Sequence, residues 1–272
     1  MIKQAIIPLA GLGTRLLPLT SVIPKELLPI NGRPGLEFIL DECIKSGVKE
    51  IIFIISKKKQ SIKKYFYNDA LYKKLIRRKK DKLLIKEYNK IKKYKKMIKF
   101  VYQNSPRGTG DAVLKCEKLI KSNFFLMLMP DDLIIKNNCS KSMISLHKKF
   151  KSSIIASKKV DRSNVSRWGI FKVKIINIRN FLIRDVIEKP AQKDAPSRYA
   201  VIGRYILPKK IFKILKKQKP GQNGEIHITD SIITLISNKN KFIGHIFAGK
   251  YLDCGTMKGY INSTLEISKY NL

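Results

Sequence analysis

Short apolar runs alternate along the chain with segments whose apolar residues recur at helical spacing. The runs predict buried strands at 4–9, 51–55, 98–102, 124–129 and 153–157. The helical spacing predicts helices at 37–46, 110–120 and 142–150. Strands that alternate with helices are typical of a parallel sheet covered on both faces. The first half therefore predicts an α/β fold with a Rossmann-like, mostly parallel sheet.

The pattern becomes richer in strands between residues 168 and 207, with runs at 170–176, 181–187 and 199–206. After Ile211 it alternates again, with helices expected near 229–237 and after Met257. We find no internal repeat and no linker rich in Pro, Gly or Ser. We therefore expect one α/β unit over 1–272, with a mixed sheet and a β-rich insertion in its second half.

The segment 57–99 is strongly basic, with 19 Lys or Arg and 3 Asp or Glu. Apolar residues such as Leu71, Leu75 and Ile91 still recur in it at roughly helical spacing. This combination predicts one or two solvated amphipathic helices rather than a linker.

The whole chain carries 57 Lys or Arg against 20 Asp or Glu, a net charge of +37. Such a charge attracts polyanions, so nucleic-acid binding is one interpretation. However, 46 of the basic residues are Lys and only 11 are Arg, and Ile is also abundant. Codon drift toward A and T enriches both Lys and Ile, whereas base recognition favours Arg. We favour drift and expect no specific nucleic-acid partner, with selected polyanion binding as the alternative.

Membrane and metal signatures are weak. No apolar run approaches the roughly 18 residues of a membrane span, and the stretch 5–10 is too short for a signal-peptide core. The 4 cysteines are scattered without a CxxC pair, which indicates neither a zinc site nor a disulfide framework. We expect a cytoplasmic protein without a membrane partner.

A glycine loop, with Gly11 and Gly13, follows the first expected strand. Clustered backbone amides in such loops bind phosphate oxygens, although a tight turn is the commoner role of Gly-x-Gly. The loop is not a Walker A motif, and Leu16 replaces the third glycine of a dinucleotide fingerprint. Arg15 and Lys25, the latter between Pro24 and Pro29, add positioned positive charge, although Lys25 alone could be a surface charge.

Seven ordered blocks carry a resemblance to a known family. They are Gly11–Pro18 with Pro24–Pro29, Gly108–Val113 after Gln103, Leu128–Asp132, Val186–Pro190, Val201–Tyr205, Gly224–Asp230 and Asp253–Gly255. Together they resemble the sugar-nucleotide pyrophosphorylases, and within these the bacterial branch that transfers uridylyl groups. The resemblance implies a nucleotidyltransferase fold of the glycosyltransferase-A type. Its nucleotide-binding half would be about 1–150 and its sugar-binding half about 151–272.

The implied reaction is attack of glucose 1-phosphate on the α-phosphorus of UTP, which yields UDP-glucose and pyrophosphate. By resemblance, the catalytic cations are Arg15, Lys25 and Lys189. The nucleotide would contact Ala10, Gly11, Gly13, Thr14, Gln103 and Gly108. The sugar would contact Gly169, Glu188 and Gly203, and Mg²⁺ would bind Asp131 and Asp253. Family members also suggest a homo-oligomer.

Purely structural roles are the alternative for several of these residues. Asp131 could be a turn residue after Pro130, Asp253 a loop carboxylate, and Glu188 part of an ion pair with Lys189. The nearest functional alternative is a pyrophosphorylase that uses dTTP or another sugar 1-phosphate. A different class would be a basic polyanion-binding protein on an inactive enzyme fold. An NAD-dependent oxidoreductase is disfavoured, because Ser56 and Lys57 follow the second strand where an acidic residue is required.

Overall fold

The computed structural model describes residues 2–221 and 224–270. The strands of its main sheet are β1 Gln4–Pro8, β4 Glu50–Ile55, β5 Ile98–Tyr102, β6 Phe124–Leu128, β8 Ser153–Lys159, β9 Gly169–Asn177, β10 Asn180–Glu188, β11 Tyr199–Pro208 and β12 Phe242–Ile246. In the described residues these form one sheet in the order β5-β4-β1-β6-β11-β8-β12-β10-β9. The sheet therefore runs without a break through both halves of the chain.

The sheet is mixed. Strands β5, β4, β1 and β6 are parallel neighbours, and β12 is parallel to β8. Strand β11 runs antiparallel to both β6 and β8, and β10 pairs antiparallel with β12 and β9. The predicted α/β class with a mixed sheet is confirmed. Parallel pairing takes a smaller share than expected, because β11 inserts between β6 and β8 in the opposite direction.

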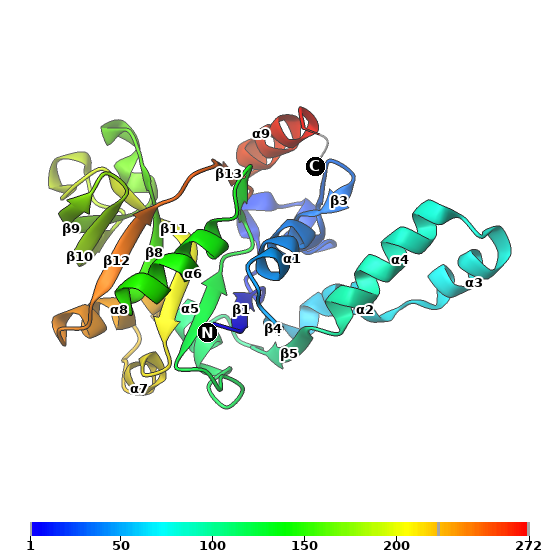
Figure 1. The fold of residues 1–272 in the computed structure, drawn as a ribbon, viewed down its shortest axis with the longest axis horizontal. Helices are drawn as coiled ribbons and strands as arrows, with labels where there is room; N and C mark the ends of the chain where they lie inside the picture. Colours follow the sequence, from blue (N-terminus) through cyan, green and yellow to red (C-terminus); the bar gives the residue numbers. More distant parts are fainter. Residues whose placement is uncertain (1, 222–223, 271–272) are drawn as a thin grey trace.

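Helices cover both faces of this sheet (Figure 1). They are α1 Gly35–Lys45, α5 Gly108–Leu114, α6 Cys139–Phe150, α7 Ile211–Leu215, α8 Ile228–Ser237 and α9 Met257–Ser268. Helices α1, α6 and α9 contribute to one buried cluster, and α5, α7 and α8 contribute to the other. Successive strand residues serve opposite faces, since Ile6 belongs to the second cluster and Ile7 to the first.

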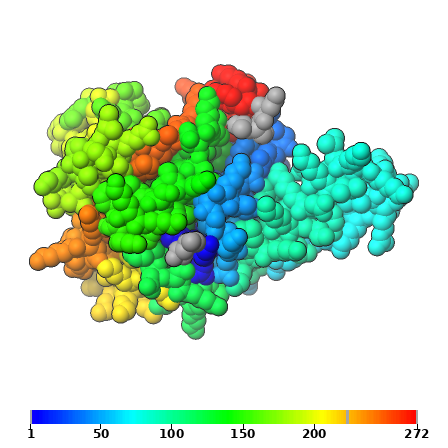
Figure 2. All heavy atoms as spheres, viewed as in Figure 1, coloured from blue at the N-terminus to red at the C-terminus, as the bar shows by residue number. Residues whose placement is uncertain are grey.

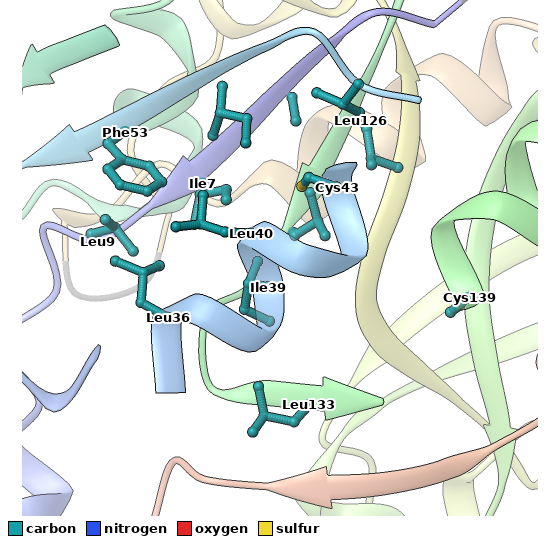
Figure 3. Packing of buried hydrophobic residues seen from close by; sticks show 14 of the residues in the cluster. Ile7, Leu9, Leu36, Ile39, Leu40, Cys43, Phe53, Leu126, Leu133 and Cys139 are labelled. Carbon is teal, nitrogen blue, oxygen red and sulfur yellow. The ribbon is translucent and has the colours of Figure 1, made fainter. Parts of the chain in front are cut away.

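Helix α1 illustrates how the first cluster is stabilised (Figure 3). Its Leu36, Leu40 and Cys43 face Ile7 of β1 and Phe53 of β4. These side chains are at most 1% exposed. Because each large apolar side chain contributes about 1.5–3 kcal/mol when buried, this packing fixes α1 and the loop before it against the sheet.

The basic segment 57–99 forms three helices, so the expectation of one or two is wrong. They are α2 Gln60–Tyr67, α3 Ala70–Lys79 and α4 Lys82–Lys95. The break between α3 and α4 has a local cause: Lys80 is left-handed with φ 48°, and the Asp81 side chain accepts the N–H groups of Leu83 and Leu84. We call α2–α4 the arm, because it projects from the body in Figures 1 and 2.

The arm is anchored only at its base. Ile62 and Phe66 of α2 and Ile91 and Tyr94 of α4 are buried in the first cluster. Every residue of α3 is at least partly exposed. The outer part of the arm therefore contributes little to the core.

Four of the short strands that the structure describes were not predicted. Strands β2 Pro29–Ile30 and β3 Arg33–Pro34 pair antiparallel with each other. The other two are β7 Asp132–Ile135 and β13 Lys250–Asp253. They pair antiparallel and place Asp253 opposite Asp132. The helix expected at 110–120 is shorter, since α5 ends at Leu114 and the chain continues in turns. Within the described residues, no helix is long and apolar enough to cross a membrane.

Candidate active site

The glycine loop and the segment after β6 meet at one edge of the sheet. Strands β1 and β6 are parallel neighbours, so their carboxyl ends lie together, the usual position of a ligand site in an α/β sheet. A cavity of about 460 Å³, the loop cavity, opens there. Its lining includes the predicted Ala10, Gly11, Gly13, Thr14, Lys25, Gln103 and Gly108. The structure thus brings all the predicted nucleotide-binding residues together.

Within the glycine loop, the two glycines differ in their surroundings. Gly13 is left-handed with φ 73°, and its carbonyl accepts the Thr20 hydroxyl at 2.8 Å. A side chain on Gly11 would meet no atom of the described chain within 4 Å. Gly13 is therefore required by the turn, whereas the protein itself imposes no glycine at position 11.

The opposite wall of the loop cavity is built by the 103–111 segment and the residues before α8. The Gln103 Nε2 donates to Asp111 Oδ2 at 2.8 Å and to the Gly108 carbonyl at 3.1 Å. Gly108 has φ 91°, and a Cβ there would lie 2.5 Å from the Ile226 carbonyl oxygen. The absence of a side chain at Gly108 thus admits the Ile226 backbone. Glu225 and His227 also line the cavity. They belong to the Gly224–Asp230 block, but no site role was predicted for them.

A second cavity of about 380 Å³, the carboxylate cavity, adjoins the first at Met129. Its lining is Arg15, Met129, Asp131, Asp132, Arg167, Trp168, Tyr251, Asp253 and Thr256. The structure therefore places the predicted Arg15, Asp131 and Asp253 around one space. Arg167, Tyr251 and Thr256 were not predicted. For Tyr251, the signal was available: in an extended segment it shares a face with Asp253.

An ion pair joins the two cavities. The Lys25 Nζ lies 2.7 Å from Asp131 Oδ2, and the Arg15 guanidinium lies 3.8 Å from the same oxygen. Burial raises the pKa of Asp131, but the charge and hydrogen bond of Lys25 outweigh it and the net pKa is lowered. Burial likewise lowers the pKa of Lys25, but Asp131 and Glu26 leave it raised. Both groups therefore stay charged near neutral pH.

Asp131 and Asp253 converge on the same point. A Cβ built on Gly255 would lie 2.9 Å from Asp131 Oδ2 and 3.1 Å from Asp253 Oδ1. The backbone fixes this arrangement, because the Cys254 N–H donates to the Asp131 carbonyl and the Gly255 N–H donates to Asp253 Oδ1, each at 2.8 Å. Arg167 lies 3.5 Å from the other Asp253 oxygen.

Two converging carboxylates fit a hard divalent cation that takes its remaining ligands from phosphate and water. Across the described residues, no group of three or more His, Cys, Asp or Glu side chains is arranged to hold a metal ion.

Asp132 is occupied by internal contacts. Its Oδ1 accepts the Tyr251 hydroxyl at 2.6 Å, and its Oδ2 accepts the Gly203 N–H at 2.8 Å. Burial, with the neighbouring Asp131 charge, raises the pKa of Asp132 to about 6. A Cβ on Gly203 would lie 2.3 Å from Asp132 Oδ2 and 2.5 Å from Met129 Cβ. Gly203 thus makes room for protein atoms, a role that the sequence reasoning did not foresee.

The other predicted sugar-side residues form a separate group beside Trp168. The Lys189 Nζ lies 4.0 Å from Glu188 Oε1, and both side chains are mostly exposed. A Cβ on Gly169 would lie 3.0 Å from Glu188 Oε2. Lys189 is left-handed with φ 43°, and its N–H donates to the Trp168 carbonyl. The structure brings Gly169, Glu188 and Lys189 together beside Trp168, which lines the carboxylate cavity.

Comparison with known proteins gives a consistent family. The model of the family described as nucleotidyl transferase matches residues 4–269. A putative UTP–glucose-1-phosphate uridylyltransferase of Methanocaldococcus jannaschii is 35% identical over 270 residues, covering 98% of this chain and 93% of that protein. A UTP–glucose-1-phosphate uridylyltransferase 2 of Streptococcus pyogenes is 36% identical over 274 residues, with coverages of 97% and 90%.

Solved structures agree. A UDP-glucose pyrophosphorylase complexed with UDP-glucose superposes with a TM-score of 0.88 at 35% identity, covering 99% of each chain. A UTP-bound UGPase from Acinetobacter baumannii gives a TM-score of 0.89 at 31% identity, covering 100% of this chain and 95% of the other.

Proposed function

The chain belongs to the nucleotidyl transferase family, and from this premise we propose that it transfers the uridylyl group of UTP to glucose 1-phosphate. The products are UDP-glucose and pyrophosphate. The observation that carries the proposal is the Lys25–Asp131 pair, which lies where the loop cavity meets the carboxylate cavity. Two adjoining cavities with fixed charge between them suit a reaction that joins two phosphate-bearing substrates.

The chemical difficulty is electrostatic, because an anionic phosphate must attack the α-phosphorus of another anion. Positioning and fixed positive charge are the physical remedies. In our proposal, the amides of Ala10, Gly11, Gly13 and Thr14 hold the triphosphate, while Lys25 and Arg15 stabilise the charge that develops at the reacting phosphate. The nucleophile is already ionised near neutral pH, so the chain does not need to supply a general base.

We assign the remaining residues according to the cavity that each lines or adjoins. Gln103 and the Gly108 backbone would orient the base. Glu188, Lys189 and Gly169 would approach the hexose phosphate beside Trp168, with Gly203 supporting the site from within. Asp131 and Asp253 would hold Mg²⁺, which when bound neutralises phosphate charge. The proposal assigns about 1–150 to the nucleotide and about 151–272 to the sugar.

A cytoplasmic location is part of the proposal. Its support is that Cys43, Cys116, Cys139 and Cys254 are all buried free thiols. Free thiols are usual in reducing compartments.

Pyrophosphate release from purified protein tests the proposal. We expect turnover with UTP, glucose 1-phosphate and Mg²⁺, much weaker turnover with dTTP, and loss of turnover with a chelator. Asp131→Asn and Asp253→Asn are each expected to lower kcat by at least about 10²-fold. The control is Asp161→Asn, since the Asp161 side chain is 81% exposed and forms a surface ion pair with Arg198. Turnover with dTTP alone, or unchanged turnover in both site variants, would contradict the proposal.

A further inference from the structure

A fully buried arginine lies behind the carboxylate cavity. Arg204, on β11, is 0% exposed and pairs with Glu42 of α1. Its Nε donates to both Glu42 carboxylate oxygens at 3.1 Å, and its Nη2 donates to Glu42 Oε2 at 2.9 Å. The rest of the guanidinium remains available for other acceptors.

Those acceptors are two backbone carbonyls that flank Asp131 in sequence and one carbonyl on β11. The Arg204 Nη1 donates to the Met129 carbonyl at 3.2 Å and to the Gly203 carbonyl at 3.0 Å. Its Nη2 donates to the Asp132 carbonyl at 2.6 Å. One rigid, planar group therefore grips the 129–132 segment before and after the residue that pairs with Lys25.

Glu42 is itself fixed from a third element. Its Oε1 accepts the Ser140 hydroxyl at 2.5 Å and the Ser140 N–H at 3.1 Å, in the first turn of α6. The Glu42 carbonyl accepts the Asn138 side-chain amide at 2.9 Å. The network thus connects α1, α6 and β11 to the site, although Arg204 itself lines neither the loop cavity nor the carboxylate cavity.

A contribution to stability does not by itself explain why this buried ion pair is present. Buried ion pairs often contribute no more than apolar side chains of similar volume, because two charges lose their hydration. What apolar side chains cannot do is donate to three carbonyls at once. Without Arg204, the Met129 and Asp132 carbonyls would lose donors, and fewer hydrogen bonds would hold the segment between them in place.

We propose that Arg204, held by Glu42, is a positioning residue that sets the Asp131 carboxylate against Lys25 and Asp253. This inference rests on the proposed function for the purpose of that carboxylate. It predicts that disturbing Arg204 weakens cation binding at a site which Arg204 does not itself touch.

Binding of Mn²⁺, followed by electron paramagnetic resonance with and without UTP, tests this separately from turnover. We expect Arg204→Lys and Glu42→Gln to weaken Mn²⁺ binding by about 10- to 100-fold, the usual effect of losing a group that orients a metal ligand. The Mg²⁺ concentration for half-maximal turnover should rise in parallel, while KM for glucose 1-phosphate changes little. Ser140→Ala, which removes one hydrogen bond to Glu42, should act in the same direction but less.

The matched control is Arg33→Lys. Arg33 forms ion pairs with Glu37 and Asp41 of the same helix α1, and neither pair involves the 129–132 segment. It should lower thermal stability without moving the Mn²⁺ titration. Circular dichroism identifies variants that fail to fold, and Ser140→Ala serves if both stronger variants do.

The outcomes separate the two proposals. Mn²⁺ titrations that coincide for wild type, Arg204→Lys and Ser140→Ala would overturn the positioning role. Mn²⁺ binding that depends on Arg204 and Asp131, in a protein that releases no pyrophosphate, would support it and contradict the proposed function instead.

Discussion

A residue of the site can be required by the fold or by a bound ligand, and two glycines illustrate the difference. A side chain at Gly203 would collide with Asp132 and Met129, whereas one at Gly11 would meet open space. Only the first constraint belongs to folding. The second position is free as far as the protein is concerned, so any requirement for glycine there must come from a ligand.

Alanine at these two positions should therefore have opposite signatures. Gly203→Ala is expected to cost about 1–3 kcal/mol of unfolding free energy through overpacking, and to lower turnover by displacing Asp132. Gly11→Ala should change stability by less than about 0.5 kcal/mol. It should raise KM for UTP about tenfold or more, because the added methyl would keep the triphosphate away from the loop amides, and a hydrogen bond to a charged group contributes about 1.5–3 kcal/mol.

Urea unfolding measures the stability of the Gly203→Ala and Gly11→Ala variants, and initial-rate kinetics measure their turnover and KM for UTP. A Gly11→Ala variant that is stable and kinetically unchanged would mean that the amides of this loop do not hold the triphosphate. A Gly203→Ala variant of full stability would mean that Asp132 can retreat without cost.

At the scale of elements, the sequence was informative where local signals were strong. The buried strands β1, β4, β5, β6 and β8 were predicted, because continuous apolar runs are themselves the cause of burial. Strands β7 and β13 were missed, because they are short, carry polar residues and depend on pairing across more than 100 positions.

The same limit applied to the site. Lys25, Asp131 and Asp253 were expected from the family resemblance that their motifs carry, and the structure brings them together. Arg204 lies in the Val201–Tyr205 block but was given no role, since nothing near it in sequence shows that it meets Glu42 and the 129–132 carbonyls. Residues that act through distant contacts leave no local pattern to find.

We expect the positive charge of the arm to be unnecessary for turnover. Lys74, Lys79, Lys82 and Lys93 are exposed, and exposed surface substitutions rarely change stability by more than about 0.5 kcal/mol each. Their joint replacement by Gln is expected to leave kcat/KM for UTP within about twofold, because surface charges this far from the cavities are screened. Lys25→Gln, a change of the same type inside the site, should lower kcat by about 10²–10³-fold.

Pyrophosphate release, with circular dichroism to verify folding, compares the two variants. A large loss of turnover in the folded four-lysine variant would show that the arm takes part in the reaction and that its charge is selected.

At the scale of the whole molecule, charge is unevenly distributed. The segment 57–99 holds 19 of the 57 basic residues but only 3 of the 20 acidic ones. The rest of the chain holds 38 basic and 17 acidic residues, some of them in ion pairs such as Lys216–Glu117 and Lys250–Glu266. A net charge of +37 makes self-repulsion a property of the entire fold.

Repulsion of this kind predicts that salt stabilises the protein. The Debye length falls from about 30 Å at 0.01 M to about 8 Å at 0.15 M salt, so like charges across the molecule stop interacting while close ion pairs are weakened less. We expect Tm to rise with KCl, by about 2–4 °C for each kcal/mol of repulsion removed. Chloride is preferable to phosphate, which would bind the site we propose. The four-lysine variant, with less repulsion to screen, should show a smaller rise. A Tm that falls with KCl would mean that attraction within surface ion pairs contributes more to stability than repulsion among the lysines costs. The excess positive charge would then be offset by neighbouring carboxylates.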